Sequence, residues 1–462
     1  MVLAGCGGGE GSSSEFSSSQ SHITHHSYPL HTGITSTVFW IGEEADASNG
    51  GIANLSSAWD EKWIARYGGV DSPDQRDGYR PAGFIPRENP FYVALPFNDF
   101  DENGVRKADL QKWIPWYEPG LPEDRSYCKN RWVEIAKGDR RVYAQWEDVG
   151  PFGEDDAAYV FADAMPKNGV NDRAGIDLSP AVRDYLGVED IDRVDWRFVD
   201  EAEVPEGPWK RIVTVSGVGW PLWHRLDAGA TFQWQLTGTV DTSYDVSLYD
   251  IDLFDSSADL IERLHEDGRE VVCYFSAGSY EAWREDAADF PKEALGKDLE
   301  GWAGERWLDI RSQEIREIMR RRLDLAVQKG CDGVEPDNVD GYANDTGFPL
   351  TYADQLAYNR FLAEEAHRRG LSIGLKNDLE QVEALEPWFD FALNEECHQY
   401  DECGALDPFI DAAKPVFNVE YDDIYLDDPE ARERLCEDSR TRGFTTLVLP
   451  MNLDGSFRYD CQ

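Results

Sequence analysis

The prediction of the fold starts from nine residues, Asp332-Gly333-Val334-Glu335-Pro336-Asp337-Asn338-Val339-Asp340. Four of the nine are acids, and they stand at the end of an apolar run, beside a glycine and a proline. Carboxylates in such surroundings repel one another and lose water, so a fold rarely keeps them without a use. A second acid cluster, Asn394-Glu395-Glu396-Cys397, ends another apolar run further along the chain.

Strand-like and helix-like segments alternate on both sides of these acids. Helix-like segments lie at 257–266, 313–329 and 352–369. Apolar, strand-like segments lie at 232–236, 246–254, 271–275, 307–309, 333–335, 372–375, 389–393, 416–421 and 445–449. This alternation predicts an α/β fold, a (β/α)8 TIM barrel, for residues 214–462.

The preceding residues, 37–213, have a different pattern. One helix is expected from Ser179 to Leu186, with Ser179 as its N-cap and Pro180 in its first turn. Short strands are expected at 37–41, 91–95, 131–135, 142–146 and 158–161. Short strands joined by loops favour a smaller all-β domain, either a barrel or a sandwich.

Two segments of this first domain resemble double-psi β-barrels of the expansin and rare-lipoprotein-A type. They are Trp146-Glu147-Asp148-Val149-Gly150-Pro151 and Gly175-Ile176-Asp177-Leu178-Ser179-Pro180-Ala181. The resemblance implies that Asp148 and Asp177 lie in a groove that grips or cuts glycan. The alternative is structural, with Asp148 shaping a turn and Asp177 capping a helix. A glycan-binding accessory domain is our interpretation.

The charge of the chain is extreme. Ninety acidic residues face 44 basic ones, which gives a formal net charge of -46. Such a chain repels nucleic acid and attracts cations. We therefore expect adaptation to high salt, no nucleic-acid partner, and attraction of a cationic substrate. We also expect no membrane span, because the sequence has no apolar run long enough.

The chain has eight cysteines and no Cys-x-x-Cys motif, so we expect no zinc site and no cofactor. The spacing of six of them suggests disulfides, which imply an oxidising compartment. The expected pairs are Cys397 with Cys403, Cys436 with Cys461, and Cys273 with Cys331.

The first residues resemble a bacterial lipoprotein signal. Leu3-Ala4-Gly5-Cys6 is similar to a lipobox, and residues 7–20 form a Gly/Ser-rich tether. We expect a leader and tether over 1–36, a lipid anchor at Cys6, and a secreted or cell-envelope lipoprotein that is a monomer. The histidines in this stretch are interpreted as part of a solvated linker rather than metal ligands: His22, His25, His26 and His31.

In a (β/α)8 barrel the active site lies at the carboxyl ends of the strands. Carboxylates dominate the polar residues at these ends, and none is histidine, which disfavours a histidine triad or a metal hydrolase. Two carboxylates facing one cleft are what glycoside hydrolysis needs. The strand-end residues are Gln235, Asp252, Tyr274, Ser276, Asp309, Glu335, Asp337, Lys376, Asn377, Asn394, Glu395, Glu420 and Asn452.

Seven motifs of this half, in order along the chain, are similar to glycoside hydrolase family 114. This resemblance implies a (β/α)8 barrel, an Asp and a Glu as the catalytic pair, and endo-acting cleavage of α-1,4-linked galactosamine polymers. The motifs occupy residues 232–236, 249–255, 273–281, 307–311, 331–340, 374–377 and 394–397.

The Asp-Asn pair at the fourth strand end also looks like the nucleophile position of α-galactosidase barrels. By that analogy Asp337 is the nucleophile and Glu395 the acid/base of a retaining reaction, with the carboxyl groups about 5 to 5.5 Å apart. Glu335 and Asp340 are alternatives for the first role, and Glu396 for the second.

Further residues are expected to bind substrate. The acids Asp252, Asp309, Asp340 and Glu420 would pair with ammonium groups of the sugar. The aromatic residues Trp234, Tyr274 and Tyr421 would stack on sugar faces. Gln235, Glu335, Lys376 and Asn377 complete the expected set.

Two alternative functions remain at this point. One is a glycosidase of the same barrel type that acts on another α-linked or cell-wall glycan. The other is a non-catalytic surface lipoprotein that binds glycan.

Overall fold

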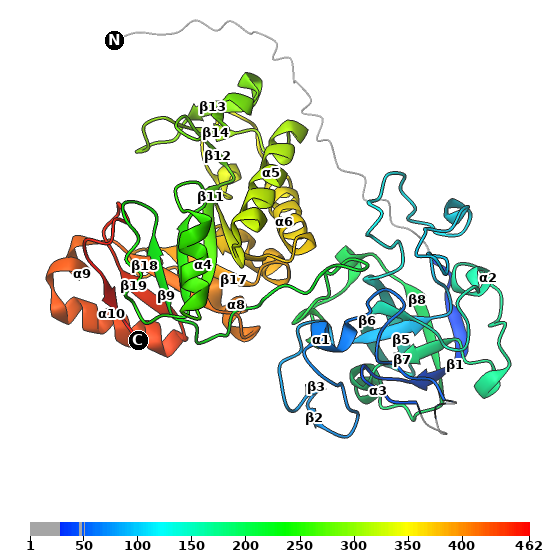
Figure 1. Cartoon of the computed structure of the whole chain (residues 1–462). Helices are drawn as coiled ribbons and strands as arrows, with labels where there is room; N and C mark the ends of the chain where they lie inside the picture. The colour runs from blue at the N-terminus through cyan, green and yellow to red at the C-terminus, as the bar shows by residue number, and fades with distance from the viewer. Residues whose placement is uncertain (1–27, 46–48, 50) are drawn as a thin grey trace, which may run out of the picture.

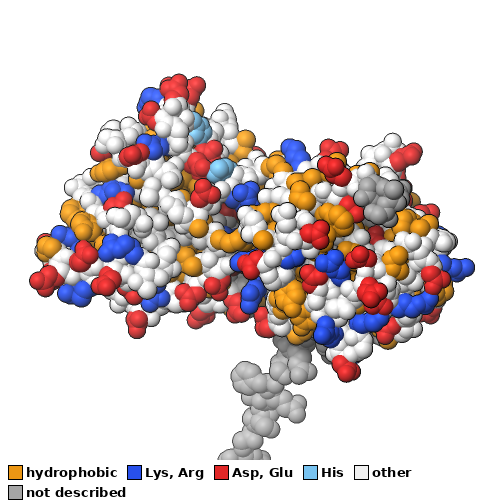
Figure 2. Space-filling model, turned by 90° about the horizontal axis from the view of Figure 1, so that it is seen from below, with side chains coloured by type: hydrophobic (Ala, Val, Ile, Leu, Met, Phe, Trp, Pro, Cys, Tyr) orange, Lys and Arg blue, Asp and Glu red, His pale blue; other side chains and the backbone are white. Residues whose placement is uncertain are grey.

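A computed structural model describes residues 28–45, 49 and 51–462, which form two parts joined by an extended segment (Figure 1). Cys6, His22, His25 and His26, for which a lipid anchor and a solvated linker are expected, lie outside the described residues. Acidic side chains are spread over both parts on the face seen in Figure 2, with basic side chains between them. Among the described residues no helix is both long and apolar enough to cross a membrane.

The first part contains a closed barrel of six strands in the order β1-β7-β4-β6-β5-β8. The pairs β1–β7 and β4–β6 are parallel, and the other pairs are antiparallel. Its core is aromatic, with Trp146, Tyr159 and Trp196 fully buried. The strands are β1 (His31–Val38), β4 (Tyr92–Leu95), β5 (Arg131–Lys137), β6 (Arg140–Val149), β7 (Ile176–Leu178) and β8 (Asp192–Phe198).

Short elements cover this barrel. The predicted helix is confirmed as α3, since the Ser179 side chain accepts a hydrogen bond from the amide of Val182. The strand expected at 158–161 is wrong, because these residues form helix α2 and the turn after it. The elements are α1 (Trp63–Tyr67), α2 (Ala157–Val160), α3 (Pro180–Leu186) and the small pair β2 (Arg76–Asp77) and β3 (Arg80–Pro81).

The expected tether is shorter than predicted at its carboxyl end. Strand β1 begins at His31, and the His31 ring is buried and stacks on Trp196 at 4.1 Å between ring centroids. Burial lowers the pKa of His31 to about 4. His31 is therefore part of the barrel core and not of a solvated linker.

The second part is built on a nine-stranded sheet with eight parallel strands in chain order. A short antiparallel strand, β20 (Tyr459–Asp460), is added at the edge beside β19. The parallel strands are β9 (Phe232–Gln235), β10 (Leu248–Asp252), β11 (Glu270–Ser276), β15 (Gly333–Asp337), β16 (Ser372–Lys376), β17 (Phe391–Glu395), β18 (Val416–Glu420) and β19 (Thr445–Val448).

Helices follow the parallel strands from β10 to β18 and cover the outer face of the sheet (Figure 1). They are α4 (Ala258–Glu266), α5 (Gln313–Lys329), α6 (Tyr352–Arg368), α7 (Val382–Leu385), α8 (Asp407–Asp411), α9 (Asp423–Asp427) and α10 (Pro429–Arg442). The sheet is buried on both faces, so its strands read as apolar runs rather than as alternating ones.

The sheet curls until its first and last strands meet. The rings of Phe232 on β9 and Phe417 on β18 are 4.6 Å apart, and the Thr445 hydroxyl donates to the carbonyl of Ala230 at 3.0 Å. Inside this curl lies one apolar cluster that includes Trp234, Leu248 and Phe391, and a separate cluster packs beneath the helices. The curled sheet is consistent with the expected barrel.

One expected barrel strand is not part of the sheet. Residues 307–309 overlap β14 (Glu305–Leu308), which pairs with β12 (Ser279–Glu281) and β13 (Leu295–Asp298) in a separate three-stranded sheet. This insert follows the carboxyl end of β11 and stands above it in Figure 1. As a result β15 is the fourth strand of the main sheet and β17 the sixth.

The joining segment is attached to both parts. The guanidinium of Arg66 donates to the carbonyl of Trp220. The ring of Trp223 stacks on His367 at 3.9 Å, and its indole donates to Asp390 at 2.9 Å. The joining segment thus contacts the first part through Trp220, and it contacts the second part through Trp223, next to residues that precede β16 and β17.

The three expected disulfides are confirmed: Cys273–Cys331, Cys397–Cys403 and Cys436–Cys461. All three lie in the second part, whereas Cys128 is a free and buried thiol in the first. The Cys273–Cys331 bond links β11 to the turn that precedes β15, and the Cys397–Cys403 bond closes the loop after β17.

Replacing both cysteines of a disulfide by serine should destabilise the second part, and the loss should grow with the logarithm of the length of the loop that is released. The Cys273–Cys331 bond spans 58 residues and the Cys397–Cys403 bond spans 6. The expected losses in the free energy of unfolding are about 4 and about 2 kcal/mol. Denaturant unfolding of the two double variants measures them. Equal losses would contradict a role in restricting the unfolded chain.

Candidate active site

Three adjacent strands bring four charged side chains together inside the curled sheet. Glu335 and Asp337 lie on β15 and Lys376 on β16, while Glu395 ends β17. The Lys376 ammonium lies 3.1 Å from Glu335 Oε1, 3.2 Å from Asp337 Oδ1 and 3.3 Å from Glu395 Oε2. One cation therefore joins three carboxylates at the centre of the site.

The Lys376 side chain is almost completely buried, at 2% exposure, and its ammonium lies 4.7 Å from the centroid of the Trp234 ring. Burial alone would lower its pKa. The carboxylates of Asp337, Glu335 and Glu395 outweigh burial and raise the pKa well above its ordinary value. Lys376 is thus a permanent cation and not a proton donor.

Glu335 forms the floor of the site. It is fully buried, and its second oxygen accepts a hydrogen bond from the Trp234 indole at 3.1 Å. Burial raises the pKa of Glu335 to about 7, against the opposing effect of Lys376. Trp234 is only 1% exposed, so the expectation that it stacks on a sugar is wrong. It positions Glu335 instead.

Of the three carboxylates around Lys376, Asp337 and Glu395 are the ones that solvent reaches, with side-chain exposures of 21% and 28%. The Tyr274 hydroxyl donates to Asp337 Oδ2 at 3.1 Å, and the Tyr421 hydroxyl donates to Glu395 Oε1 at 2.6 Å. The Asn377 amide donates to Glu395 Oε2 at 3.3 Å. The two tyrosines therefore hold carboxylates through their hydroxyl groups.

The backbone turns sharply after each of these strands. Asn338, Asn377 and Glu396 follow β15, β16 and β17, and their φ angles are 59°, 50° and 62°. Residues other than glycine rarely adopt this left-handed conformation, and asparagine tolerates it best. The backbone N–H of Asn338 also donates a hydrogen bond to Asp337 Oδ1 at 2.7 Å, so the turn itself orients the carboxylate.

Asp340 and Asp378 form a second acidic pair at the rim. Burial first, and Asp337 next, raise the pKa of the half-buried Asp340 to about 6. Burial, with Asp340 as the next cause, raises the pKa of Asp378 to about 9. Neither acid has a basic partner within 4 Å among the described residues. Glu396 is also half-buried, and burial raises its pKa.

Four expected substrate-binding residues are engaged elsewhere. Asp252 is held by both guanidinium nitrogens of Arg284, at 2.6 and 2.9 Å. Gln235 is 1% exposed, and its amide bonds the backbone of the following loop. Both are therefore corrections to the expected site.

Asp309 lies after β14 in the inserted sheet, and it pairs with Arg311 at 2.7 Å, which lowers its pKa. Glu420 is fully buried under the loop after β17, where it accepts from the amide of His398 at 3.0 Å. Burial raises its pKa to about 7. Neither acid meets the Lys376 cluster, and this corrects both predictions.

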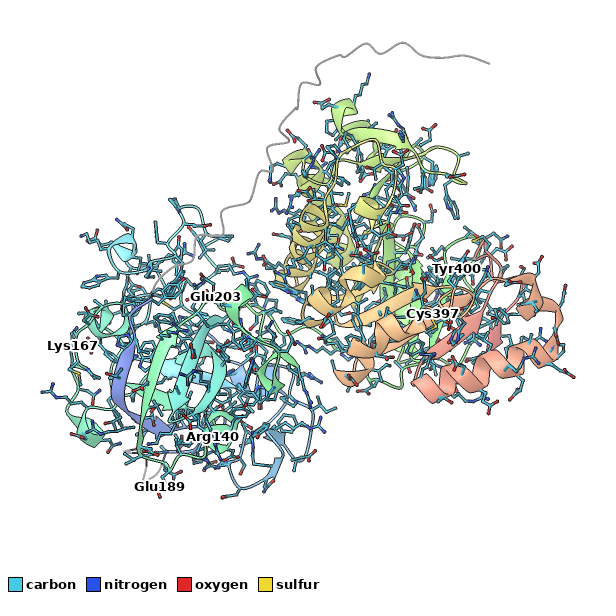
Figure 3. The ribbon with its side chains drawn as sticks, turned by 180° about the vertical axis from the view of Figure 1, so that it is seen from behind. Arg140, Lys167, Glu189, Glu203, Cys397 and Tyr400 are labelled. Atoms are coloured by element: carbon cyan, nitrogen blue, oxygen red, sulfur yellow. A yellow bond between two sulfur atoms is a disulfide. The ribbon has the colours of Figure 1, made fainter. Side chains whose placement is uncertain are left out.

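Sequence reasoning missed Asp250, because it examined only residues at the strand ends, and it also passed over Asp378, which directly follows the strand-end residue Asn377. Asp250 lies in the middle of β10 and is fully buried, yet an acid in the middle of an apolar strand was a usable signal. It also missed exposed aromatic side chains in the loops above the site. Trp283 and Trp302 are 55% and 52% exposed in the insert. Tyr400 is 62% exposed beside Cys397 (Figure 3).

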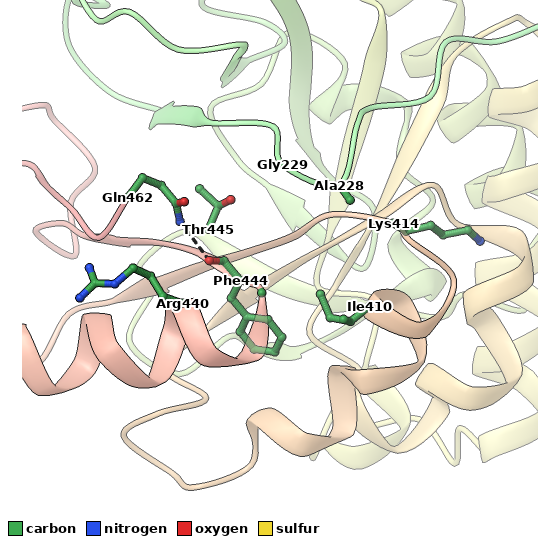
Figure 4. A pocket seen from close by; sticks show the side chains of 9 residues that line it. Ala228, Gly229, Ile410, Lys414, Arg440, Phe444, Thr445 and Gln462 are labelled. Atoms are coloured by element: carbon green, nitrogen blue, oxygen red, sulfur yellow. Dashed lines mark hydrogen bonds between the residues drawn. The ribbon is translucent and has the colours of Figure 1, made fainter. Parts of the chain in front are cut away.

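A cavity of about 410 Å³ opens at the other end of the sheet (Figure 4). It is lined by residues that precede the strands, among them Gly229 before β9 and Phe444 before β19. The carboxylate cluster lies at the opposite, carboxyl ends. This cavity is therefore separate from the active site.

In the described part of the chain, one group of side chains has the spacing of a metal site: Cys397, His398 and Cys403. The two cysteines form a disulfide, so their sulfur atoms are not free to bind a metal.

Asp148 and Asp177 lie near each other in the first part, at the ends of β6 and β7. Burial raises the pKa of each to about 7. Asp148 accepts from the amide of Ala58 at 2.8 Å, and Asp177 accepts from the Thr37 hydroxyl. Asp177 does not cap α3, because Ser179 does so.

A curled parallel sheet with paired carboxylates at its carboxyl ends is the arrangement of a glycoside hydrolase. The family model described as Glycoside-hydrolase family GH114 matches residues 214–462. This match covers more than half of the chain, so the chain belongs to glycoside hydrolase family 114 and is a glycoside hydrolase.

Two solved structures are among the similar ones. The crystal structure of Aspergillus fumigatus Ega3 in complex with galactosamine has 41% sequence identity, covers 53% of this chain and 100% of its own, and has a TM-score of 0.50. The glycoside hydrolase domain of PelA from Pseudomonas aeruginosa has 16% identity, covers 49% of this chain and 96% of its own, and has a TM-score of 0.40. A search of the curated proteins gave no match.

Replacing Lys376 by methionine should leave three carboxylates without their shared cation. We expect the free energy of unfolding at neutral pH to fall by about 3–5 kcal/mol, as for other broken buried ion pairs. Burial raises the pKa of Glu335 and Lys376 opposes this effect, so loss of the cation raises the pKa of Glu335 further above its unfolded value. The deficit should therefore shrink as pH falls through that raised pKa. Unfolding curves of both proteins against pH test this, and a deficit independent of pH would contradict it.

Proposed function

We propose that this protein is an endo-acting (β/α)8 glycosidase that cleaves α-1,4-linked galactosamine-containing exopolysaccharide. The observation that carries the proposal is the Asp337–Lys376–Glu395 cluster in a family 114 chain. The 41% identity to Ega3, which was solved with galactosamine, supports an amino-sugar substrate. The alternative substrate is another α-linked or cell-wall glycan. The alternative function is that of a surface lipoprotein that binds glycan but does not cleave this polymer.

In this proposal Asp337 is the nucleophile. Lys376, the Tyr274 hydroxyl and the Asn338 amide all donate to its oxygens, which stabilises the anion. The anion attacks the anomeric carbon, and Glu395 gives its proton to the departing glycosidic oxygen. A covalent glycosyl-enzyme forms. Water then attacks the same carbon, Glu395 takes the proton of that water, and Asp337 is released.

The retaining outcome is supported by the shared cation. Because Asp337 and Glu395 each have an oxygen on the Lys376 ammonium, at 3.2 and 3.3 Å, these two oxygens lie at most about 6.5 Å apart. Inverting enzymes need roughly 6.5–9.5 Å between the carboxyl groups, and retaining enzymes about 5–5.5 Å. This upper limit does not exceed the shortest separation of inverting enzymes, and it supports direct attack by Asp337.

Glu395→Gln should lower kcat on the polymer by about 10²- to 10⁴-fold, because it removes the proton donor. Asp337→Asn should lower it at least as much. Reducing-end assays measure both variants, with Glu383→Gln on the exposed surface of α7 as the matched control. In the wild type, NMR of the first product should show the α-anomer. An initial β-anomer would contradict the retaining mechanism, and unchanged turnover in Glu395→Gln would contradict the assignment of the acid.

The rim acids support a substrate that carries ammonium groups. The structural contacts of Asp252, Asp309 and Glu420 leave Asp340 as the remaining expected partner of an amino sugar. Asp340 has no salt bridge among the described residues and is linked electrostatically to Asp337 and Asp378. A sugar ammonium would relieve this repulsion, whereas an acetylated nitrogen would not.

Deacetylated polymer should therefore be cleaved faster than the fully acetylated polymer. The preference should weaken in Asp340→Asn, and in the wild type it should weaken as pH falls below about 6, where Asp340 gains a proton. Initial rates on both polymers, at low and high salt, measure the preference. Equal rates on the two polymers would remove the electrostatic explanation.

For the first part of the chain we propose a double-psi-like barrel with an accessory role in binding glycan. The closed six-stranded barrel and the adjacent Asp148 and Asp177 support this proposal. We also propose a secreted or cell-envelope location, which the three disulfides support. The proposed lipid anchor at Cys6 and adaptation to high salt accompany this location.

A further inference from the structure

Asp250 is a buried acid to which no group in the described part of the chain donates a hydrogen bond. It lies in β10, beside Trp234 of β9 and Val272 of β11, and it is 0% exposed. Among the described residues, neither of its carboxyl oxygens has a hydrogen-bond partner. A buried carboxylate without donors is a costly arrangement, so the protonation state of Asp250 needs a physical explanation.

The neighbour of Asp250 is itself a carboxyl group. Asp250 lies within hydrogen-bonding reach of Glu335 on β15, and both Asp337 and Lys376 act on it electrostatically. The adjacent residues on β9 and β11, Trp234 and Val272, carry no ionisable group. Two ionised carboxylates only accept hydrogen bonds, so this contact requires a proton on one of them.

The local charge balance assigns that proton. Lys376 is shared by Glu335, Asp337 and Glu395, while Glu335 also receives the Trp234 indole. Asp250 has no donor of its own. Burial, and then the charge of Glu335, raise the pKa of Asp250 well above its ordinary value. The proton belongs on Asp250, where it fills the missing hydrogen bond.

We propose that Asp250 is a positioning residue that carries a proton at the working pH and donates it in a hydrogen bond to Glu335. The pair then has one negative charge rather than two. Glu335 stays fixed below Lys376, and the ammonium stays between Asp337 and Glu395. The catalytic importance of this arrangement rests on the proposed function, but the presence of the proton does not.

Infrared difference spectroscopy tests the proton directly, without substrate. At mildly alkaline pH, the spectrum of the wild type minus that of Asp250→Asn should contain the carbonyl band of a protonated carboxylic acid, which shifts in heavy water. Asp378→Asn is the matched control, because the pKa of Asp378 is raised to about 9 and this variant should lose a separate band. Loss of a carboxylate band in Asp250→Asn, in place of an acid band, would overturn the proposal.

Activity provides the second test. Asparagine keeps a neutral donor to Glu335, so Asp250→Asn should retain kcat/KM within about threefold. Asp250→Ala leaves an acceptor of Glu335 unpaired and should lower it by about 5- to 150-fold. Melting temperatures identify any variant that fails to fold. If the asparagine and alanine variants lose activity equally while both remain folded, a donated hydrogen bond is not the role of Asp250.

The pH profile separates this role from a charge effect. Replacing a neutral acid by an amide leaves the local charge unchanged, so the alkaline limb of kcat/KM should stay in place in Asp250→Asn. Glu335→Gln removes a negative charge near the general acid, Glu395. Its ionisation then becomes easier, and the alkaline limb of kcat/KM moves to lower pH. A similar shift in Asp250→Asn would show that Asp250 is ionised in the wild type. If the wild-type protein fails to cleave galactosamine polymers, the proposed substrate is wrong. The infrared band still shows whether Asp250 carries a proton, because that measurement uses no substrate.

Discussion

The ammonium of Lys376 is the interaction on which the second part of the molecule depends. Four carboxyl groups lie inside one curled sheet, on β10, β15 and β17, and the bridging cation comes from the strand between β15 and β17. Mutual repulsion would otherwise push these acids apart or neutralise them. Because the cation is buried, its attraction to them is little screened by water or salt. This is an advantage for a chain whose surface is so strongly acidic.

The four acids differ in how deeply they are buried, and the buried pair has a different role from the pair that faces solvent. Glu335 and Asp250 lie below the cation and are sealed from water, whereas Asp337 and Glu395 lie beside it and face solvent. The lower pair sets the charge and position of Lys376, and the upper pair is available to a sugar. On β15, strand alternation places Glu335 and Asp337 on the same face, and the two-residue spacing along the strand places them at different depths.

Much of this arrangement was predictable from sequence, because apolar runs that end in acids mark the mouth of a parallel barrel. Asp337, Glu395, Lys376 and Asn377 were found in this way, and the cysteine spacing predicted the three disulfides. Prediction failed where partners distant in sequence decide the outcome. Arg284 forms a salt bridge with Asp252, and the buried indole of Trp234 donates a hydrogen bond to Glu335. The short run at 307–309 has strand composition, yet it pairs within an insert whose position depends on the whole fold.

The left-handed turns at Asn338, Asn377 and Glu396 affect how variation at this site should be interpreted. A saturation scan would find Asn338 tolerant of glycine and intolerant of valine, since β-branched residues strongly disfavour a positive φ. Such a profile mimics that of a residue with a chemical role. It would instead report the geometry of the chain where it leaves the strand, together with the side-chain hydrogen bonds of Asn338 to Ser276 and of Asn377 to Glu395. Invariance among relatives at these positions is therefore weak evidence for contact with the sugar.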